Sequence, residues 1–401
     1  MPRWLLPENI ADVLPSEARH IEELRRQLLD LYRSYGYELV MPPLIEHIDA
    51  LLTGSGRDLG LRTFQLVDQL SGRTLGVRAD ITPQVARIDA HLLNRRGVAR
   101  LCYCGSVLHT RSPSPFATRE PIHIGAELYG HAGFEADLEI IDLLVRSLDL
   151  AECGQVRIDL CHVAIVPALL ALHGPVPGLD DEDLYALLQG KDVPGLSEAL
   201  ADAPPALRDA LLALTGLHGP VEAGRAATDS ANPIRRARLL LPGAGPIVQA
   251  LDQLERLVAS PLWRRWPEAG LSIDLADLRG YRYHNGVTFS AYVEDVPYAI
   301  ARGGRYDNVG RVFGRARLAT GFSIELRALA GLQPDLCPAP SIRAPWSDDA
   351  ALLETIAGLR GAGEIVIQEL PGSKQEQQEF ACDRELVTDN GRWLVRELKR
   401  E

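Results

Sequence analysis

The sequence predicts an α+β fold in which an antiparallel sheet is flanked by helices. Apolar, strand-like segments paired around turn-rich stretches predict two β-hairpins, at residues 98–131 and 287–302. A Leu/Ala-rich region at about 167–260, broken by Pro and Gly, predicts a helical insertion. Residues 346–401 predict a small C-terminal α/β segment. The two hairpins favour antiparallel strand order in the main sheet.

Composition and charge disfavour several classes of protein. With 401 residues, 46% apolar and 24% charged, the chain can bury a large core and form two or three domains. A net charge of −12 argues against a broad nucleic-acid surface. The six cysteines lack zinc-site spacing, so we expect reduced, buried thiols and no metal. Neither a signal-peptide segment nor a membrane-spanning run is present, so we expect a cytoplasmic protein without membrane contact.

The first predicted element is a helix that begins at Ser16, after Pro15, and ends at Gly36. Its apolar residues recur at helical spacing, at Ile21, Leu24, Leu28, Leu31 and Tyr35. Residues 37–41 predict a short strand. Pro42-Pro43 end this strand, because proline cannot donate to a sheet ladder.

The first hairpin is predicted from strands at 98–108 and 122–129 that flank a Ser/Pro-rich loop at 112–115. The second hairpin is predicted from strands at 287–293 and 298–302. Gly303-Gly304 is then expected to form a tight turn before Arg305-Tyr306-Asp307.

A strand that runs directly into a helix is predicted at 319–328. We expect one large domain at 1–333, a Pro-containing linker at 334–345 and the small segment at 346–401. Within that segment, 364–367 and 393–395 are strand candidates.

Three segments carry a resemblance to a known family. They are Arg78-Ala79-Asp80-Ile81-Thr82, Arg279-Gly280-Tyr281-Arg282-Tyr283-His284-Asn285-Gly286 and Gly303-Gly304-Arg305-Tyr306-Asp307. At this spacing they resemble the catalytic domain of histidyl-tRNA synthetases, which are class II aminoacyl-tRNA synthetases, from about residue 10 to residue 330. The resemblance implies the class II sheet topology and a dimer formed through the segment around Pro43.

The residues for amino acid activation depart from the family pattern. His109 and Ala328 stand where the family has arginines for the ATP phosphates, and Glu325 replaces a glycine beside the adenine. An unperturbed imidazole is mostly neutral at pH 7 and lacks the guanidinium fork, although Arg111 could partly substitute for it. Each lost donor lowers the rate about 10²–10³-fold. We therefore expect activation to be lost and no cofactor to be bound.

The amino acid pocket retains more of its polar groups. The resemblance implies that Asp80 and Thr82 hold the α-ammonium group of histidine, that Glu127 binds its imidazole and that Arg279 pairs with its carboxylate. His123 replaces a family glutamine, and His284 a ring-contacting tyrosine. The candidate histidine-binding residues are Asp80, Thr82, His123, Glu127, Arg279, Tyr283 and His284. The alternative is that the acids are solvated or cap helices and that Arg279 forms a scaffold ion pair.

A chain that keeps the amino acid pocket but has lost the residues for activation resembles the regulatory subunits of ATP phosphoribosyltransferase, the first enzyme of histidine biosynthesis. The resemblance implies a non-catalytic subunit that dimerises, assembles with a short-form catalytic subunit and lets free L-histidine inhibit the assembly. One alternative is a divergent histidine-activating ligase. Another is a degenerate synthetase domain that senses uncharged tRNA, which 12 acidic against 7 basic residues over 180–260 disfavour.

Overall fold

The computed structural model describes most of the chain as two compact units. The described residues are 5–52, 57–112, 117–225, 229–294, 296–312, 314–334, 337–372 and 379–398. The first unit comprises Met1–Ala11 and Glu23–Gln333, and the second comprises Asp12–Glu22 and Pro334–Glu401. The predicted Ser/Pro-rich loop at 112–115 lies, beyond its first residue, outside the described residues. Among the described helices, none is long and apolar enough to cross a membrane.

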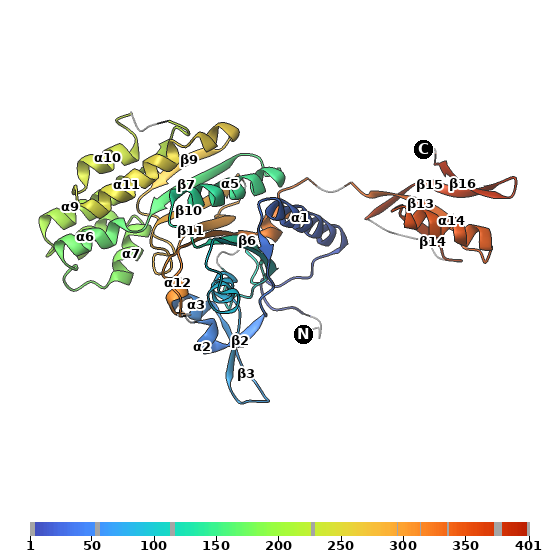
Figure 1. Cartoon of the computed structure of the whole chain (residues 1–401), viewed down its shortest axis with the longest axis horizontal. Helices are drawn as coiled ribbons and strands as arrows, with labels where there is room; N and C mark the ends of the chain where they lie inside the picture. Colours follow the sequence, from blue (N-terminus) through green and yellow to red (C-terminus); the bar gives the residue numbers. More distant parts are fainter. Residues whose placement is uncertain are drawn as a thin grey trace. The chain divides into compact units, whose positions relative to one another are not determined.

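A nine-stranded mixed sheet forms the centre of the first unit (Figure 1). In sheet order its strands are β1 (Glu38–Leu39), β5 (Ala99–Ser106), β6 (Ile122–Tyr129), β12 (Ala319–Glu325), β11 (Ala301–Arg305), β10 (Val287–Val293), β7 (Val156–His162), β9 (Gly270–Asp274) and β8 (His218–Val221). The pairs β1–β5 and β7–β9 are parallel, and the other neighbours are antiparallel. The predicted α+β class is confirmed, with parallel pairing added toward both edges.

Helices pack on one face of this sheet. Helix α5 (Phe134–Leu150) contacts β6 and β12, and α11 (Gly245–Val258) contacts β7 and β10. From α1 (Pro15–Ser34), Tyr32 is fully buried and meets the ring of Phe322 edge-on at 5.9 Å. The helix boundaries predicted for α1 are confirmed, and Gly36 adopts a φ of 82° just after its end. The face covered by these helices is therefore the core side of the sheet.

The region expected to be a helical insertion contains helices that pack mainly on one another. They are α6 (Ile165–His173), α7 (Asp181–Gln189), α8 (Val193–Ala199), α9 (Pro205–Gly216) and α10 (Pro233–Leu240), followed by α11. Strand β8 and the 3₁₀ helix η2 (Pro261–Arg265) complete the region. Asp180 and Asn232 cap α7 and α10 with their side-chain oxygens, which explains where these two helices begin.

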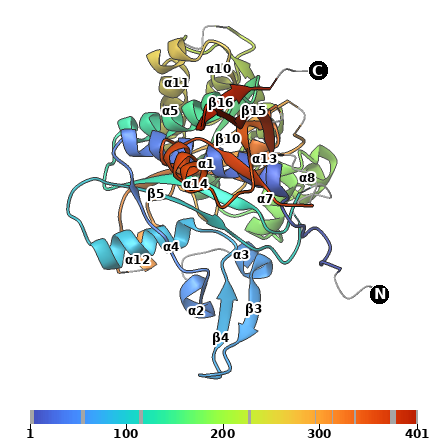
Figure 2. The same ribbon diagram turned by 90° about the vertical axis from the view of Figure 1, so that its right-hand side faces the viewer.

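A separate three-stranded sheet projects from the same unit (Figure 2). Its order is β2 (Ile45–His47), β4 (Thr74–Val77) and β3 (Phe64–Val67), with α2 (Ile48–Leu51) beside it. The remaining helical elements of the first unit are α3 (Arg57–Arg62), α4 (Thr82–Arg87), the π-helix η1 (Ile88–Leu93), α12 (Val309–Val312) and α13 (Leu326–Ala330).

Two strand predictions in the first unit are wrong in part. The strand expected at 37–41 is only β1, Glu38–Leu39. The strand expected at 298–302 is instead β11, so Gly303 and Gly304 lie inside a strand and form no turn. A Cβ at Gly303 would overlap the carbonyl oxygen of Gly321 and the ring of Phe289. These glycines permit close packing within the sheet, and this produces the same sequence pattern as a turn.

The second unit contains a four-stranded sheet and one helix. Its sheet order is β14 (Val366–Glu369), β13 (Ala339–Pro345), β15 (Phe380–Asp389) and β16 (Arg392–Glu397), with α14 (Ala350–Gly361) packed against β14 and β16. The interpretation of 334–345 as a linker is therefore wrong for β13, whose Ile342 and Ala344 belong to the buried core. The two prolines of β13, Pro340 and Pro345, concealed this strand in the sequence.

None of the six cysteines, all of which lie among the described residues, forms a disulfide, and not all of them are buried as expected. Cys102, Cys153 and Cys161 are buried, whereas Cys337 and Cys382 of the C-terminal segment are exposed. The small core of that segment leaves much of its sheet accessible to solvent.

Candidate functional site

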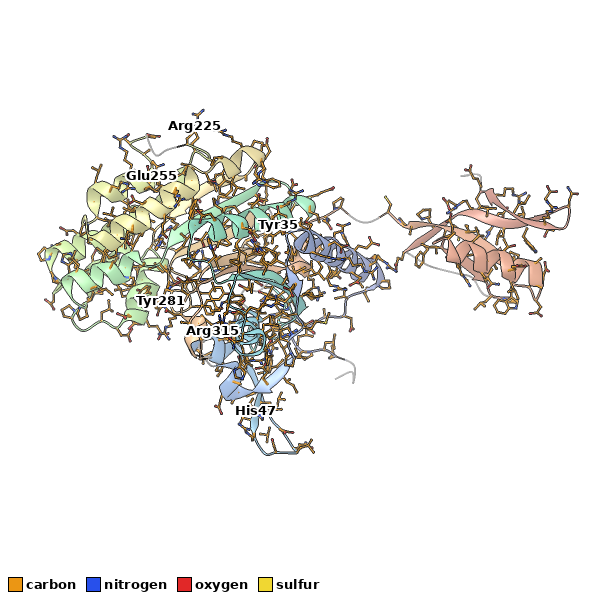
Figure 3. All side chains as sticks on the ribbon, in the orientation of Figure 1. Tyr35, His47, Arg225, Glu255, Tyr281 and Arg315 are labelled. Atoms are coloured by element: carbon orange, nitrogen blue, oxygen red, sulfur yellow. The ribbon has the colours of Figure 1, made fainter. Side chains whose placement is uncertain are left out.

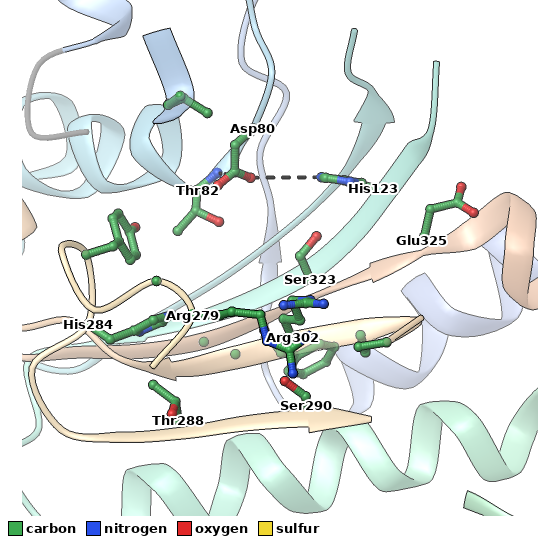
Figure 4. Close-up of a pocket in the computed structure, with 18 of the residues that line it drawn as sticks. Asp80, Thr82, His123, Arg279, His284, Thr288, Ser290, Arg302, Ser323 and Glu325 are labelled. Carbon is green, nitrogen blue, oxygen red and sulfur yellow. Dashed lines mark hydrogen bonds and ion pairs between the residues drawn. The ribbon is translucent and has the colours of Figure 1, made fainter. Parts of the chain in front are cut away.

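A cavity of about 610 Å³ lies over the face of the large sheet that α5 and α11 leave open. The strand register determines which side chains form its floor, because directly paired residues point to the same face. One row contains Glu127, Gly321, Gly304 and Thr288, and the next contains Gly125, Ser323, Arg302 and Ser290. Figure 4 shows several of these side chains directed into one space.

All seven predicted site residues line this cavity: Asp80, Thr82, His123, Glu127, Arg279, Tyr283 and His284. They come from the start of α4, from β6 and from the segment that precedes β10. Their convergence from positions up to 204 residues apart in the chain is a result of the sheet order, which brings β6, β12, β11 and β10 together.

Glu127 is the most deeply buried acid of the cavity, with 1% of its surface exposed. Tyr103 donates a hydrogen bond of 3.3 Å to Oε1, and Tyr306 donates one to Oε2. Desolvation raises the pKa of Glu127 to about 8, and the charge of Asp80 adds to the increase, while the tyrosine hydrogen bonds oppose it. Gly321 has to be glycine here, because a Cβ would overlap the Glu127 carboxyl.

Asp80 and His123 face each other across the cavity, with 3.9 Å between Oδ1 and Nδ1 (Figure 4). Asp80 also accepts a hydrogen bond of 2.7 Å from the backbone N–H of Ile81. Desolvation favours the protonated form of Asp80, but the combined attraction of His123 and the backbone N–H groups outweighs it and lowers the pKa. Asp80 is therefore an anion at neutral pH, and its side chain remains 34% exposed.

Thr82 is the first residue of α4, and its hydroxyl is 3.1 Å from the hydroxyl of Tyr103. Tyr103 also donates to Glu127, so it links Thr82 to that carboxyl. Thr82 thereby connects the Asp80 end of the cavity with its Glu127 end.

His109 stands at the position of a family arginine, but its side chain is not available to bind a phosphate. It is 2% exposed, and its Nε2 lies 2.9 Å from the carbonyl oxygen of Ala79. Desolvation, together with the nearby charge of Arg62, lowers the pKa of His109 to about 4, so the ring is neutral at pH 7. Arg111 is exposed and does not line the cavity, whereas Arg62 does.

Glu325 and Ala328 occupy the other altered positions. Glu325 caps α13, since its side chain accepts hydrogen bonds from the backbone N–H groups of Arg327 and Ala328 at 3.1 and 2.6 Å. Ala328 supplies only this backbone donor, and its side chain cannot contact a phosphate as an arginine would. The replacement of a family glycine by Glu325 thus has a structural role at a helix start.

Arg279 is engaged by a neighbouring acid. Its Nε and one terminal nitrogen donate to both carboxylate oxygens of Asp277, at 2.5 and 2.6 Å, and the same terminal nitrogen donates to Tyr292 at 2.7 Å. The scaffold ion pair considered from the sequence is therefore present. Arg279 still lines the cavity, but its guanidinium is largely used within the protein.

Tyr283 and His284 form an aromatic edge of the cavity. The ring of Tyr283 is tilted against that of Tyr306 at 4.8 Å, and its buried hydroxyl has no hydrogen-bond partner among the described residues. His284 places Nδ1 3.3 Å from the carbonyl oxygen of Arg305, and desolvation lowers the pKa of its ring to about 4. Tyr281, labelled in Figure 3, stacks on Tyr185 of α7 at 3.8 Å. This stacking joins the segment to the insertion.

The Gly-Gly-Arg-Tyr-Asp motif stabilises the fold and also contributes to the cavity. Arg305, 8% exposed, forms a 2.9 Å ion pair with Asp137 of α5. Asp307 accepts from the backbone N–H of Ala319 at 3.0 Å. Tyr306, between them, reaches Glu127.

Sequence reasoning missed Tyr306 and Arg302 as cavity residues, and it missed Tyr103, which donates to Glu127 without lining the cavity. Tyr103 could have been found from strand alternation, because it shares the face of its paired hairpin position. Tyr306 stood within a recognised motif. Arg302 could be placed only with the register of β10, β11 and β12.

Comparisons with known proteins agree with this geometry. The family model described as "Histidyl-tRNA synthetase" matches residues 9–329, and the model described as "ATP phosphoribosyltransferase subunit HisZ C-terminal domain" matches residues 339–396. The second match begins at the first residue of β13, which again places that strand in the C-terminal segment.

Relatives named ATP phosphoribosyltransferase regulatory subunit match over the whole chain. The relative from Ralstonia nicotianae is 59% identical over 100% of this chain and 99% of its own. The relative from Paraburkholderia phymatum is 59% identical over 100% of both. A solved ATP phosphoribosyltransferase regulatory subunit/histidyl-tRNA synthetase from Bacillus halodurans shares the fold, with a TM-score of 0.78 and 24% identity over 93% of this chain and 94% of that one. The chain belongs to the family of ATP phosphoribosyltransferase regulatory subunits, which have a histidyl-tRNA synthetase-like fold.

Proposed function

We propose that this regulatory subunit binds free L-histidine in the cavity and thereby controls a short-form ATP phosphoribosyltransferase catalytic subunit in a hetero-oligomer. Its role belongs to the first step of histidine biosynthesis, and it performs no amino acid activation of its own. The observation that supports histidine binding most directly is the position of Glu127. A buried carboxyl lies in the same cavity as the anionic Asp80, so an imidazole and an ammonium group find separate acceptors.

The altered activation residues support a non-catalytic role. A neutral His109 that contacts a backbone carbonyl cannot offset the charge on a phosphate. Ala328 has no side-chain donor, and Glu325 places a carboxyl in the wall where the family packs adenine. These three positions count against the divergent-ligase alternative.

Regulation requires that histidine bind two states of the assembly unequally. The cavity is joined to the insertion through the stacked pair of Tyr281 and Tyr185 and through the 2.7 Å ion pair of Arg282 and Glu182. These contacts offer a physical route by which an occupied cavity could change the position of the insertion. The proposal also includes self-association through the segment around Pro43 and a cytoplasmic location. It includes no nucleic-acid or membrane partner.

The test is the rate of phosphoribosyl-ATP formation by a short-form catalytic subunit, with and without this chain, across a histidine titration. Stimulation by the chain and inhibition by histidine are expected together. An unchanged rate with a competent catalytic subunit would contradict the assembly. Inhibition that persists unchanged in both D80N and E127Q would instead move the histidine site elsewhere.

A further inference from the structure

Arg302 is a cation that lines the cavity but belongs to none of the three segments that carry the family resemblance. It lies on β11, directly paired with Ser290 of β10 on one side and with Ser323 of β12 on the other. Since paired residues share a face, the guanidinium stands between two hydroxyl-bearing side chains. Figure 4 shows Arg302 beside Arg279, with Ser290 and Ser323 close by.

The two neighbouring arginines differ in how their charges are satisfied. Arg279 is held by both oxygens of Asp277 and by Tyr292. Arg302 is exposed to solvent and lines the cavity, and its guanidinium makes no hydrogen bond or ion pair with any residue in the described part of the chain. Desolvation by the cavity walls and the charge of Arg279 lower the pKa of Arg302, the charge of Asp277 opposes this, and the guanidinium stays protonated at neutral pH. A cavity-lining guanidinium without a partner in the protein can accept an anion from outside it as its hydrogen-bond partner.

A second group at the same place also lacks a partner. The hydroxyl oxygen of Ser323 is buried and has no hydrogen bond to the described residues. Buried polar atoms in folded proteins are nearly always paired, so an orphan hydroxyl next to an orphan guanidinium indicates a position for a ligand atom. An anion there could accept from Arg302 and from Ser323 at once.

We propose that Arg302, with Ser290 and Ser323, forms the subsite for the α-carboxylate of bound histidine. Arg302 and Glu127 both belong to the floor of the cavity. They are separated by two strand spacings across the sheet and by two residues along it, which gives about 12 Å between their Cα atoms at usual sheet spacings. Both side chains extend into the cavity from this floor, which leaves room for one amino acid between their polar ends. The carboxylate role implied for Arg279 by the family resemblance passes to Arg302, because Asp277 already neutralises Arg279.

This inference rests on the proposed binding of histidine in the cavity, and the test separates the two. Calorimetry on the full chain, alone and with the catalytic subunit, would compare L-histidine with L-histidinol, which has a hydroxymethyl group in place of the carboxylate. A charge-assisted contact to the carboxylate predicts that the wild type binds histidine about tenfold to hundredfold more tightly. In R302Q this preference should disappear while histidinol affinity stays unchanged.

Two further variants serve as controls. R302K keeps the charge without the planar fork and should restore part of the preference. R279Q should keep the preference for histidine, because that arginine is already occupied. A preference that is lost in R279Q and kept in R302Q would overturn the assignment, as would an equal loss of both ligands in R302Q and R302K.

The remaining outcomes distinguish the sources of the anion and the two proposals. Inorganic phosphate that binds the wild type but not R302Q, with the histidine preference intact in R302Q, would assign Arg302 to a phosphate and overturn the carboxylate subsite. If neither histidine nor histidinol binds the wild type, histidine binding in the cavity fails, and the carboxylate subsite fails with it. If both bind and R302Q changes nothing, only the role of Arg302 fails.

Discussion

Replacement of Glu127 by Gln tests whether the buried carboxyl recognises the imidazole of histidine. Desolvation raises the pKa of Glu127 to about 8, in a residue only 1% exposed. At pH 7 such a carboxyl is about 90% protonated. A ring N–H that donates to the carboxylate stabilises the ionised form and lowers the pKa below 7. Histidine binding at pH 7 should therefore release between about half and nearly one proton from Glu127.

The size of the affinity change follows from two opposing contributions. Ionisation at pH 7 of a carboxyl with a pKa of about 8 takes about 1.4 kcal/mol. A hydrogen bond to a charged group contributes about 1.5–3 kcal/mol. Wild-type affinity should thus rise about fivefold between pH 7 and pH 8, as the ionised fraction increases. E127Q should bind histidine about tenfold to hundredfold more weakly at pH 8, without this pH dependence.

The assay is calorimetric titration at pH 7 in two buffers of different ionisation enthalpy, which counts protons released per histidine bound. In E127Q the count should fall to about 0.2, the share that the free imidazole itself carries with a pKa near 6.5. E325Q is a matched control, because Glu325 also lines the cavity but is occupied in capping α13. It should keep the wild-type count.

An unchanged proton count in E127Q would refute the reasoning, and so would a wild-type count near zero. Stability provides an internal check on the pKa. The folded-state pKa of Glu127 is raised above the ordinary value of 4.5, so its contribution to stability is complete below about pH 4.5 and is lost as the pH rises through about 8. Thermal unfolding of E127Q should lack this loss.

Three further predictions concern the cavity and its support. Asp80→Asn should raise the histidine concentration needed for half-inhibition about tenfold while sparing stimulation of the catalytic subunit, and unchanged inhibition would exclude Asp80 as the ammonium ligand. Gly321→Ala should lower the unfolding free energy by about 1–3 kcal/mol in urea titrations, because the new Cβ overlaps Glu127; a neutral effect would contradict this packing. Arg305→Met should lower it by about 3–5 kcal/mol, since Asp137 is left buried without a partner, and the double change with Asp137→Leu should recover much of the loss.

Local patterns in the sequence were sufficient for elements whose signals are local. The boundaries of α1 and of the first hairpin follow from helical spacing, from alternation and from Gly36, and the structure agrees with them. Strand β13 was missed, because two prolines contradict the usual strand composition and its paired residues lie up to 42 positions away in the chain.

The candidate site also contains contacts that local patterns in the sequence could not predict. Resemblance placed seven residues, and the sheet brings all of them to one cavity. It could not show that Asp277 already neutralises Arg279, because that contact depends on the conformation of two side chains two residues apart. Nor could it reveal Arg302, whose place on the floor depends on three strands from distant parts of the chain. What was missed therefore depended on side-chain conformation and on pairing between strands, and not on composition.

The balance of charge in the cavity supports the proposed binding of a free amino acid over that of a nucleoside triphosphate. At pH 7 Glu127 is mostly protonated, and His109 and His284 are neutral. Asp80 supplies an anion, and Arg302 a cation whose guanidinium forms no ion pair with the described residues, although the charge of Asp277 acts on it. Arg62, which rests against His109, is a further cation, but a triphosphate would need several preorganised donors beside it. One acid and one arginine match the two charges of a zwitterion, so the loss of phosphate-binding arginines leaves amino acid recognition possible without activation.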